Sequence, residues 1–150
     1  MQTENNDTSS RDERVVELQA QGWLPQKGSG PFFQLIGPLW KRRTGDVFEY
    51  AMLAEHRHLN SAGVVHGGLL VSLIDQVISQ VVWYATDRLP MATVQLDSHF
   101  LAPAHEGDLI VASARITSKA RSLAFVTGEL AVDETTVLMT QAIMKLKARQ

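Results

Sequence analysis

Residues 60–75 read NSAGVVHGGLLVSLID, and this stretch decides the fold that the sequence predicts. Asn60, His66 and two glycines come directly before an apolar segment, which a carboxylate, Asp75, interrupts. Over residues 68–84 the polar side chains recur at spacings of three and one, so on a helix they share one narrow stripe. These polar positions are Ser72, Asp75, Gln76, Ser79 and Gln80. We therefore predict a long and largely buried helix with one polar edge.

Segments with the alternation and turn signals of β-strands lie on both sides of this helix. They cover residues 32–36, 47–55, 91–101, 109–117, 123–132 and 136–146. Because consecutive strands usually pair, the last four predict an antiparallel meander. Residues 91–101 alternate in part, and this pattern places Thr93 on the opposite face to Leu96. Strands before and after one helix in a short chain predict an α+β fold, with the helix packed on an antiparallel sheet.

The first 25 residues differ in character from the rest of the chain. Residues 1–10 are polar and predict a disordered tail, followed by a short helix over 11–21 that Ser9 or Ser10 would cap. The N-terminus has no apolar segment, so no signal peptide is expected, and the apolar stretches elsewhere are too short or too interrupted for a membrane span. We expect a tail and short helix over 1–25 and a folded domain over 26–150.

Composition excludes several classes of function. The chain has 150 residues, a formal net charge of -2 and no cysteine. The absence of cysteine excludes disulfides, thiolate metal sites and cysteine nucleophiles. The basic run at 41–43 is short enough to be a solvated turn. We expect a cytoplasmic protein that binds neither nucleic acid nor membrane.

Asp75 is the strongest catalytic candidate on the pattern alone. No lysine or arginine lies within helical reach of it. A carboxylate in that setting suits a general base. Free amides at a helix N-terminus attract developing negative charge, and Gly67 and Gly68 let a ligand approach that backbone closely. The alternatives are a stripe that faces solvent and glycines that only relieve a tight turn.

The histidines raise the question of a metal. His56, His58 and His66 lie close together in the sequence. No acidic or sulfur ligand is spaced to complete a site with them. We therefore expect no metal.

The distance between the two catalytic features favours a dimer. Asp75 follows Gly67 by eight residues, or about 12 Å along a helix. An oxyanion donor must lie about 3 Å from the atom it stabilises, and a short aspartate side chain cannot span the remaining gap. If both groups act on one carbonyl, they come from different chains, which predicts a homodimer with two composite sites.

The spacing N-x5-HGG-x6-D, formed by Asn60, His66, Gly67, Gly68 and Asp75, resembles the hotdog-fold acyl-CoA thioesterases of the phenylacetic-acid-degradation type. The resemblance covers roughly residues 30–148 and includes ATVQLDSHFLAPAHEGD and SKARSLAFVTGEL. It implies a long central helix wrapped by a curved antiparallel sheet of five or six strands. It also implies dimers joined edge to edge, which in many members pair again into tetramers.

The same resemblance implies roles for individual residues. Asp75 matches the general base or nucleophile, and the Gly67 amide matches the group that polarises the thioester carbonyl. Asn60 and His66 match residues that hold the water and the thioester, and Thr93 matches a residue that positions the water.

Substrate binding is implied for a second set of residues. Gly68 adjoins the thioester position, and Lys119, Arg121 and Ser122 fall in the hairpin that meets the coenzyme A nucleotide. At position 120 this chain has alanine where the family often has glycine.

The expected activity is hydrolysis of an acyl-CoA thioester to a free acid and coenzyme A. It requires no cofactor, because coenzyme A is part of the substrate. Two alternatives stay open: an enoyl-thioester hydratase or dehydratase on the same fold, and a non-catalytic acyl-CoA-binding domain. The acyl group is not identified.

Overall fold

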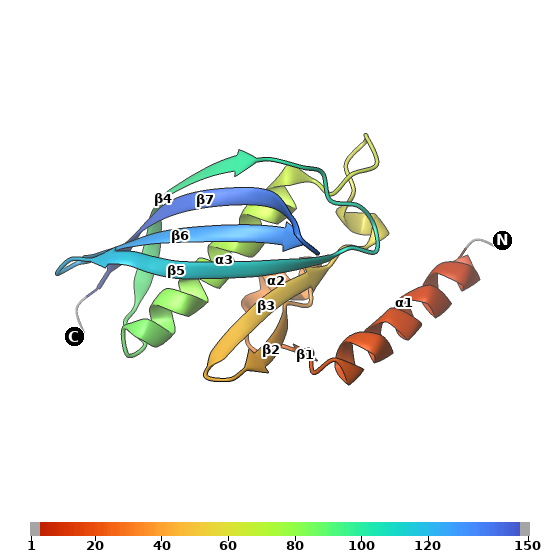
Figure 1. The fold of residues 1–150 in the computed structure, drawn as a ribbon, viewed down its shortest axis with the longest axis horizontal. Coiled ribbons are helices and arrows are strands. Elements are labelled where there is room, and N and C mark those ends of the chain that lie inside the picture. The colour runs from red at the N-terminus through yellow and green to blue at the C-terminus, as the bar shows by residue number, and fades with distance from the viewer. Residues whose placement is uncertain (1–3, 148–150) are drawn as a thin grey trace.

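The computed structural model describes residues 4–147, with side chains from residue 11 onwards. One long helix, α3 (Gly67–Ala85), lies across a curved antiparallel sheet of seven strands (Figure 1). This architecture confirms the predicted α+β class. The strands are β1 (Leu24–Pro25), β2 (Trp40–Thr44), β3 (Val47–Leu53), β4 (Met91–Phe100), β5 (Leu109–Lys119), β6 (Leu123–Val132) and β7 (Thr135–Leu146). The other helices are α1 (Glu4–Ala20), α2 (Gly30–Ile36) and the short 3-10 helix η1 (His56–His58).

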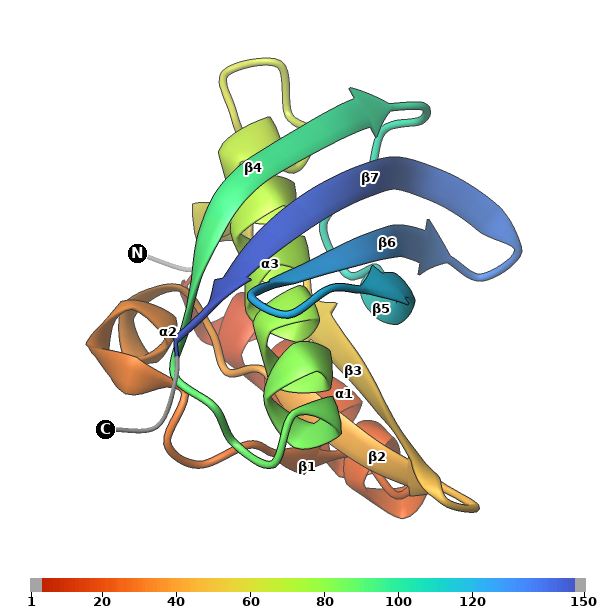
Figure 2. The same ribbon diagram turned by 90° about the vertical axis from the view of Figure 1, so that its left-hand side faces the viewer.

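The strand order corrects the predicted meander. The sheet runs β1-β2-β3-β5-β6-β7-β4, so β4 pairs with β7 at one edge and β5 pairs with β3. Only β5, β6 and β7 form a meander, since tight turns join them. The segment 101–108 after β4 is long enough to cross the end of the sheet and start β5 on the far side of β6 (Figure 2). Among the strands of residues 4–147, β4 therefore has no neighbour along one of its edges.

A bulge in β4 corrects the predicted strand faces. The pairing with β7 shifts between Thr93 and Gln95, so Val94 is the extra residue. Thr93 then lies opposite buried Met144, on the same face as Leu96. The bulge therefore turns Thr93 towards α3.

The sheet is buried on both faces near β3. Tyr50 and Met52 belong to the main core with α3, whereas Ala51 and Leu53 pack with Leu18 of α1 on the other face. The main core also depends on close approach of α3 to β6. A Cβ added at Gly128 would lie 2.9 Å from Ile74 Cδ1, so any larger residue there would force the Ile74 side chain to shift.

The N-terminal region differs most from the sequence prediction. The helix α1 begins at Glu4, so residues 4–10 are helical rather than a tail, and the predicted caps Ser9 and Ser10 lie inside it; residues 1–3 lie outside the described chain. Residues 32–36 form the end of α2 and not a strand, because Pro31 starts a short helix whose apolar run fits either structure.

Two strands that the sequence did not predict, β1 and β2, lie before β3 and α3, and the predicted strand over residues 32–36 is absent from the described chain. Residues 41–43 belong to β2 rather than to a turn, and β1 pairs with β2, which brings the sheet to one strand above the expected maximum. Leu18 and Trp23 pack with residues of β2 and β3. The division of the chain at residue 25 stays a prediction.

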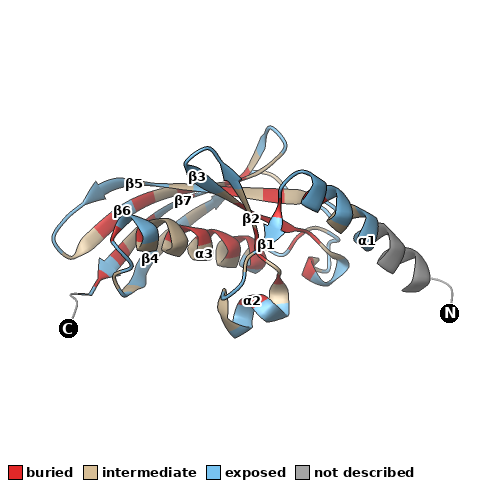
Figure 3. Cartoon of the chain, turned by 90° about the horizontal axis from the view of Figure 1, so that it is seen from below, coloured by how far each residue is buried: buried red, intermediate tan, exposed pale blue. Residues whose placement is uncertain are grey.

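The helix α3 is long and apolar enough, by length and composition alone, to cross a membrane. This corrects the expectation that every apolar stretch is too short or too interrupted. Seven of its residues are buried in the main core, and α2 lies on the side of α3 away from β5 and β7 (Figure 3). Packing within the fold therefore accounts for its apolar character.

Candidate active site

The first turn of α3 has one free amide. His66 is the N-cap, and its Nδ1 accepts the Gly68 N–H at 2.9 Å. The N–H groups of Leu69 and Leu70 donate to the His66 carbonyl at 2.9 and 3.4 Å. Within residues 4–147 the Gly67 N–H has no hydrogen-bond partner. It is therefore the amide available to an incoming anion or carbonyl.

This capping geometry fixes the tautomer of His66. A backbone N–H can only donate, so Nδ1 of His66 accepts and the ring proton lies on Nε2. A Cβ at position 68 would lie 3.1 Å from Nδ1, so a larger residue there would crowd the ring at the helix start. The exposed Nε2–H is free among the described side chains to donate to a ligand.

Asp75 and Thr93 meet in the structure. The Thr93 hydroxyl donates to Asp75 Oδ1 at 2.7 Å. Asp75 is half-buried and forms no ion pair within the described part of the chain. The other carboxylate oxygen, Oδ2, has no partner there. Thr93 thus holds the carboxylate in one orientation and leaves one oxygen for a water or a carbonyl carbon.

Asn60 organises the loop before α3. Its Oδ1 accepts the N–H groups of Ala62 and Val64 at 2.9 and 3.4 Å. The carboxamide oxygen is therefore used by the turn. The carboxamide nitrogen has no partner among the described residues, so Asn60 offers a donor at this end of the helix.

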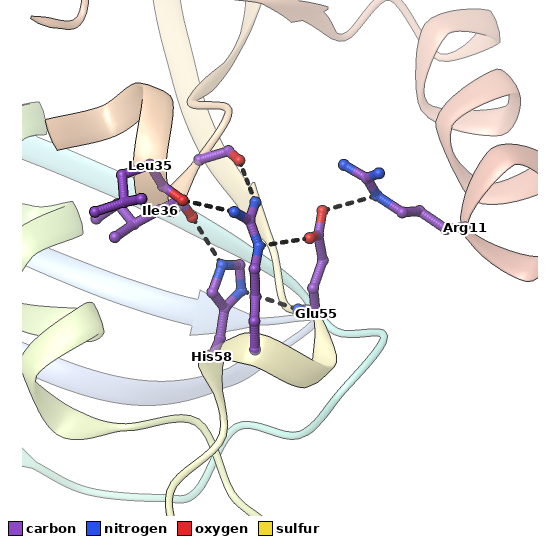
Figure 4. A network of polar contacts seen from close by, with 7 residues as sticks. Arg11, Leu35, Ile36, Glu55 and His58 are labelled. Carbon is purple, nitrogen blue, oxygen red and sulfur yellow. Dashed lines mark hydrogen bonds and ion pairs between the residues drawn. The ribbon is translucent and has the colours of Figure 1, made fainter. Parts of the chain in front are cut away.

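A polar network anchors the segment that carries Asn60 and His66 (Figure 4). The guanidinium of Arg57 donates to the carbonyls of Leu35 and Gly37 at 2.5 and 2.6 Å, and His58 Nε2 lies 2.7 Å from the Ile36 carbonyl. Two neighbouring side chains thereby bind three successive carbonyls at the C-terminal end of α2, which leaves those carbonyls satisfied.

The same network reaches α1 and the start of α3. Glu55 accepts from Arg11 of α1 at 3.0 Å and from Arg57 at 2.9 Å. On the other side, the His66 N–H donates to the His58 carbonyl at 2.8 Å. The start of α3 is thus tied to both N-terminal helices, and nothing in the local sequence pattern indicated this role for Arg57 and His58.

His58 must be neutral in this network. Its Nδ1 accepts the Glu55 N–H at 2.9 Å. A proton on Nδ1 would make it a donor as well, so that two N–H groups would point at each other. Burial lowers the pKa of His58, and the hydrogen bond to the Ile36 carbonyl partly offsets that effect. Arg57 and Arg11 also lower it, whereas Glu55 raises it. A depressed pKa means that the unfolded chain binds the proton more readily than the folded chain.

We expect the stability of the wild type to fall as the pH drops below about 6.5 towards the folded pKa of His58. His58→Gln should cost about 1–3 kcal/mol at pH 7.5, because the Glu55 N–H loses its acceptor, but it should remove part of the loss at acid pH. Urea unfolding between pH 5 and 7.5 measures both effects. The matched control is His56→Gln, because His56 is exposed. An unchanged pH slope in His58→Gln would contradict the assignment.

The predicted nucleotide residues lie on the β5–β6 hairpin, at the end of the sheet where β4 begins (Figure 1). Lys119 and Arg121 are exposed, and Ser122 accepts a hydrogen bond from Lys145 Nζ at 3.2 Å. The structure does not bring this hairpin to Gly67 of the same chain. Their role in binding stays a prediction, and Lys145 joins the set as a cation that the sequence reasoning missed.

The three-histidine metal alternative fails on donor availability. Both ring nitrogens of His58 already have partners, and Nδ1 of His66 caps α3. His56 contacts Glu106 at 3.2 Å. The part of the chain that the structure describes contains no group of three or more histidine, aspartate or glutamate side chains placed to hold a metal ion.

The outward face of the sheet carries a hollow of about 670 Å³. Its lining includes His99, Arg115, Glu129 and Met139. None of the predicted catalytic residues lines it, and Met139 lies on the face of β7 opposite to buried Leu138 and Thr140. The hollow is therefore separate from the candidate active site.

Sequence comparisons point to one family. A family model described as Thioesterase superfamily matches residues 62–139. The Caenorhabditis elegans protein named "Putative esterase F42H10.6" is 33% identical over 116 residues, which cover 75% of this chain and 68% of that protein. Acyl-coenzyme A thioesterase 13 of Mus musculus is 30% identical over 90 residues, covering 60% of this chain and 64% of the mouse protein.

Solved structures agree with the fold. A phenylacetic acid degradation-related protein from Ralstonia eutropha JMP134 is 30% identical, with a TM-score of 0.68 over 77% of this chain and 90% of that one. A Bacillus halodurans protein solved with CoA is 20% identical and has a TM-score of 0.77 over 100% of this chain and 97% of that one. These likenesses confirm the predicted hotdog fold.

Proposed function

The chain belongs to the thioesterase superfamily, and we propose that it hydrolyses acyl-CoA thioesters to a free acid and coenzyme A. The proposal rests on two groups of α3. The N–H of Gly67, at the start of the helix, has no partner among the described residues, and the carboxylate of Asp75 has one oxygen without a partner there. Thioester hydrolysis needs an oxyanion donor and a base or nucleophile, and these two groups supply them.

The chemistry uses only groups of the chain and water. In the general-base form, Asp75 removes a proton from water, whose oxygen attacks the thioester carbon, while the carbonyl oxygen becomes negative against the Gly67 N–H. The C–S bond then breaks, and the thiolate of coenzyme A takes the proton. The electrons balance without an oxidant or reductant, so we propose that no cofactor takes part. The hydroxyl of Thr93 orients the carboxylate throughout.

The identity of the thioester rests on the relatives. The Mus musculus protein is named for acyl-coenzyme A, and the Bacillus halodurans structure was solved with CoA. We extend that substrate class to this chain as a proposal, with Gly68 close to the thioester and the cations of the β5–β6 hairpin at the nucleotide phosphates. A cytoplasmic location, where acyl-CoA is made and used, completes the proposal.

We also propose a homodimer joined through β4. Among the described strands it has a neighbour on one side only, and its Val94 and Phe100 are 62% and 56% exposed. Pairing two β4 edges would satisfy the free backbone groups and cover both side chains. It would also place Gly67 and Asp75 of different chains in reach of one carbonyl, which the length of α3 forbids within one chain. The family resemblance adds the proposal that two such dimers pair into a tetramer.

The direct test is thiol release from a panel of acyl-CoAs with aromatic, short, medium and long acyl groups. Steady turnover of at least one member supports the proposal and ranks the acyl preference. Tight binding without release would identify a binding domain instead. Hydration of an enoyl-CoA, followed by loss of absorbance of the conjugated thioester without thiol release, would identify a hydratase.

A further inference from the structure

The ring of Phe100 lies next to Gly67, the residue whose N–H is free within the described chain. A Cβ added at Gly67 would lie 3.1 Å from Cε1 and 3.3 Å from Cζ of the Phe100 ring. The ring edge therefore occupies the space beside Gly67 into which a side chain at that position would project. Phe100 still exposes 56% of its surface, so a ligand or a partner chain can reach it.

The fold fixes the position of this ring. Phe100 is the last residue of β4 and pairs with Leu138, on the face that carries Thr93 and Leu96 towards α3. Just beyond it, the Ala104 carbonyl accepts the Val65 N–H at 2.8 Å, which holds the loop after β4 against the start of α3. The contact with Gly67 thus follows from two anchored segments.

A ring in this place changes the surroundings of the amide. A hydrogen bond from Gly67 to an oxyanion is stronger where water is excluded, because the effective dielectric is lower. An apolar side of the pocket also restricts the directions from which a carbonyl reaches the donor. Both effects act on the transition state more than on substrate binding, since the negative charge develops there.

We propose that Phe100 is a positioning residue of the thioesterase site: its ring shields one side of the Gly67 amide and directs the thioester carbonyl onto it. The inference rests on the proposed function. Phe100 makes no proton transfer and no covalent bond; it acts through the neighbouring amide of Gly67.

The experiment compares kcat and KM of the full chain with those of Phe100→Ala and Phe100→Met on the best acyl-CoA. Phe100→Ala should lower kcat about tenfold, equivalent to roughly 1.4 kcal/mol, and change KM by less than about threefold. Phe100→Met restores an apolar side chain of similar length and should recover most of kcat. If Phe100 only stabilised the fold, Phe100→Ala would not lower kcat while leaving KM nearly unchanged, and Phe100→Met would not restore kcat.

The matched control is Met139→Ala. Met139 is 50% exposed, lies on the neighbouring strand β7 and pairs with His99 on the outward face. Thermal unfolding and the mass in solution are measured for every variant. An unchanged kcat in Phe100→Ala overturns the inference, as does a loss shared by Met139→Ala or explained by a change in mass. A wild type that releases no thiol overturns the proposed function, and the inference with it.

Discussion

Asp75→Asn is expected to lower kcat for acyl-CoA hydrolysis by about three orders of magnitude, within the range that general acid–base groups contribute. Asparagine has nearly the same shape as aspartate, and its carboxamide oxygen can still accept the hydroxyl of Thr93. It cannot take a proton from water, and it is a poor nucleophile. The variant should therefore fold and bind as the wild type does while losing turnover.

The control for this substitution is Asp97→Asn. Asp97 lies on β4, is exposed, and accepts a hydrogen bond from Gln95 at 2.6 Å. It points to the face opposite to Thr93, away from α3. Thiol release, thermal unfolding and affinity for coenzyme A are compared for both variants. Turnover of Asp75→Asn near that of the wild type would remove Asp75 from the mechanism.

The elements that the sequence predicted well are those with long or strict periodicity. The helix over 68–84 matches α3 to one residue at each end, because its polar stripe and glycines mark it without ambiguity. The strand 123–132 matches β6 at both ends. The strand predicted over residues 32–36 was wrong because an apolar run of that length fits a strand or a helix, and Pro31 favours the start of a helix.

Strand order and strand faces depended on information that is not local. The place of β4 beside β7 follows from how segment 101–108 crosses the sheet, which no pattern within β4 records. The orientation of Thr93 follows from one extra residue, Val94, in the pairing with β7. Thr93 was nevertheless selected through the family resemblance, and the structure places its hydroxyl against Asp75.

The sequence selected the polar groups of the site but not the residues that support them. Arg57 and His58 act on carbonyls of α2 more than twenty positions earlier in the chain, and Phe100 reaches Gly67 from the end of a strand. These contacts join segments that are distant in sequence, so spacing arguments do not reveal them. The catalytic pattern was visible because it lies within one stretch of sixteen residues.

Gly67→Pro tests the oxyanion donor with little cost to the helix. Gly67 is the first residue of α3, where proline is well tolerated, and its N–H has no partner to lose within the described chain. His66 has φ -63° and ψ 131°, which suits a residue before proline. We expect kcat about 100-fold to 1,000-fold below that of Gly67→Ala, the size measured for loss of one oxyanion donor.

Gly67→Ala is the matched control because it adds the same Cβ against Phe100 and keeps the N–H. Any loss in Gly67→Ala therefore reports crowding, and the further loss in Gly67→Pro reports the amide together with the space that its ring takes. Equal activity of the two variants would show that the Gly67 amide does not stabilise the reacting oxygen.

Mixing Gly67→Pro with Asp75→Asn then asks whether the site is shared between two chains. A hybrid dimer has one composite site with both native groups and one with neither, provided that Gly67 and Asp75 come from different chains. Refolding the two variants together at equal amounts should restore about a quarter of the wild-type activity, since half of the dimers are hybrids with one intact site each. If both groups acted from the same chain, every site would lack one of them and the mixture would stay inactive. Recovery would thus establish the proposed composite dimer.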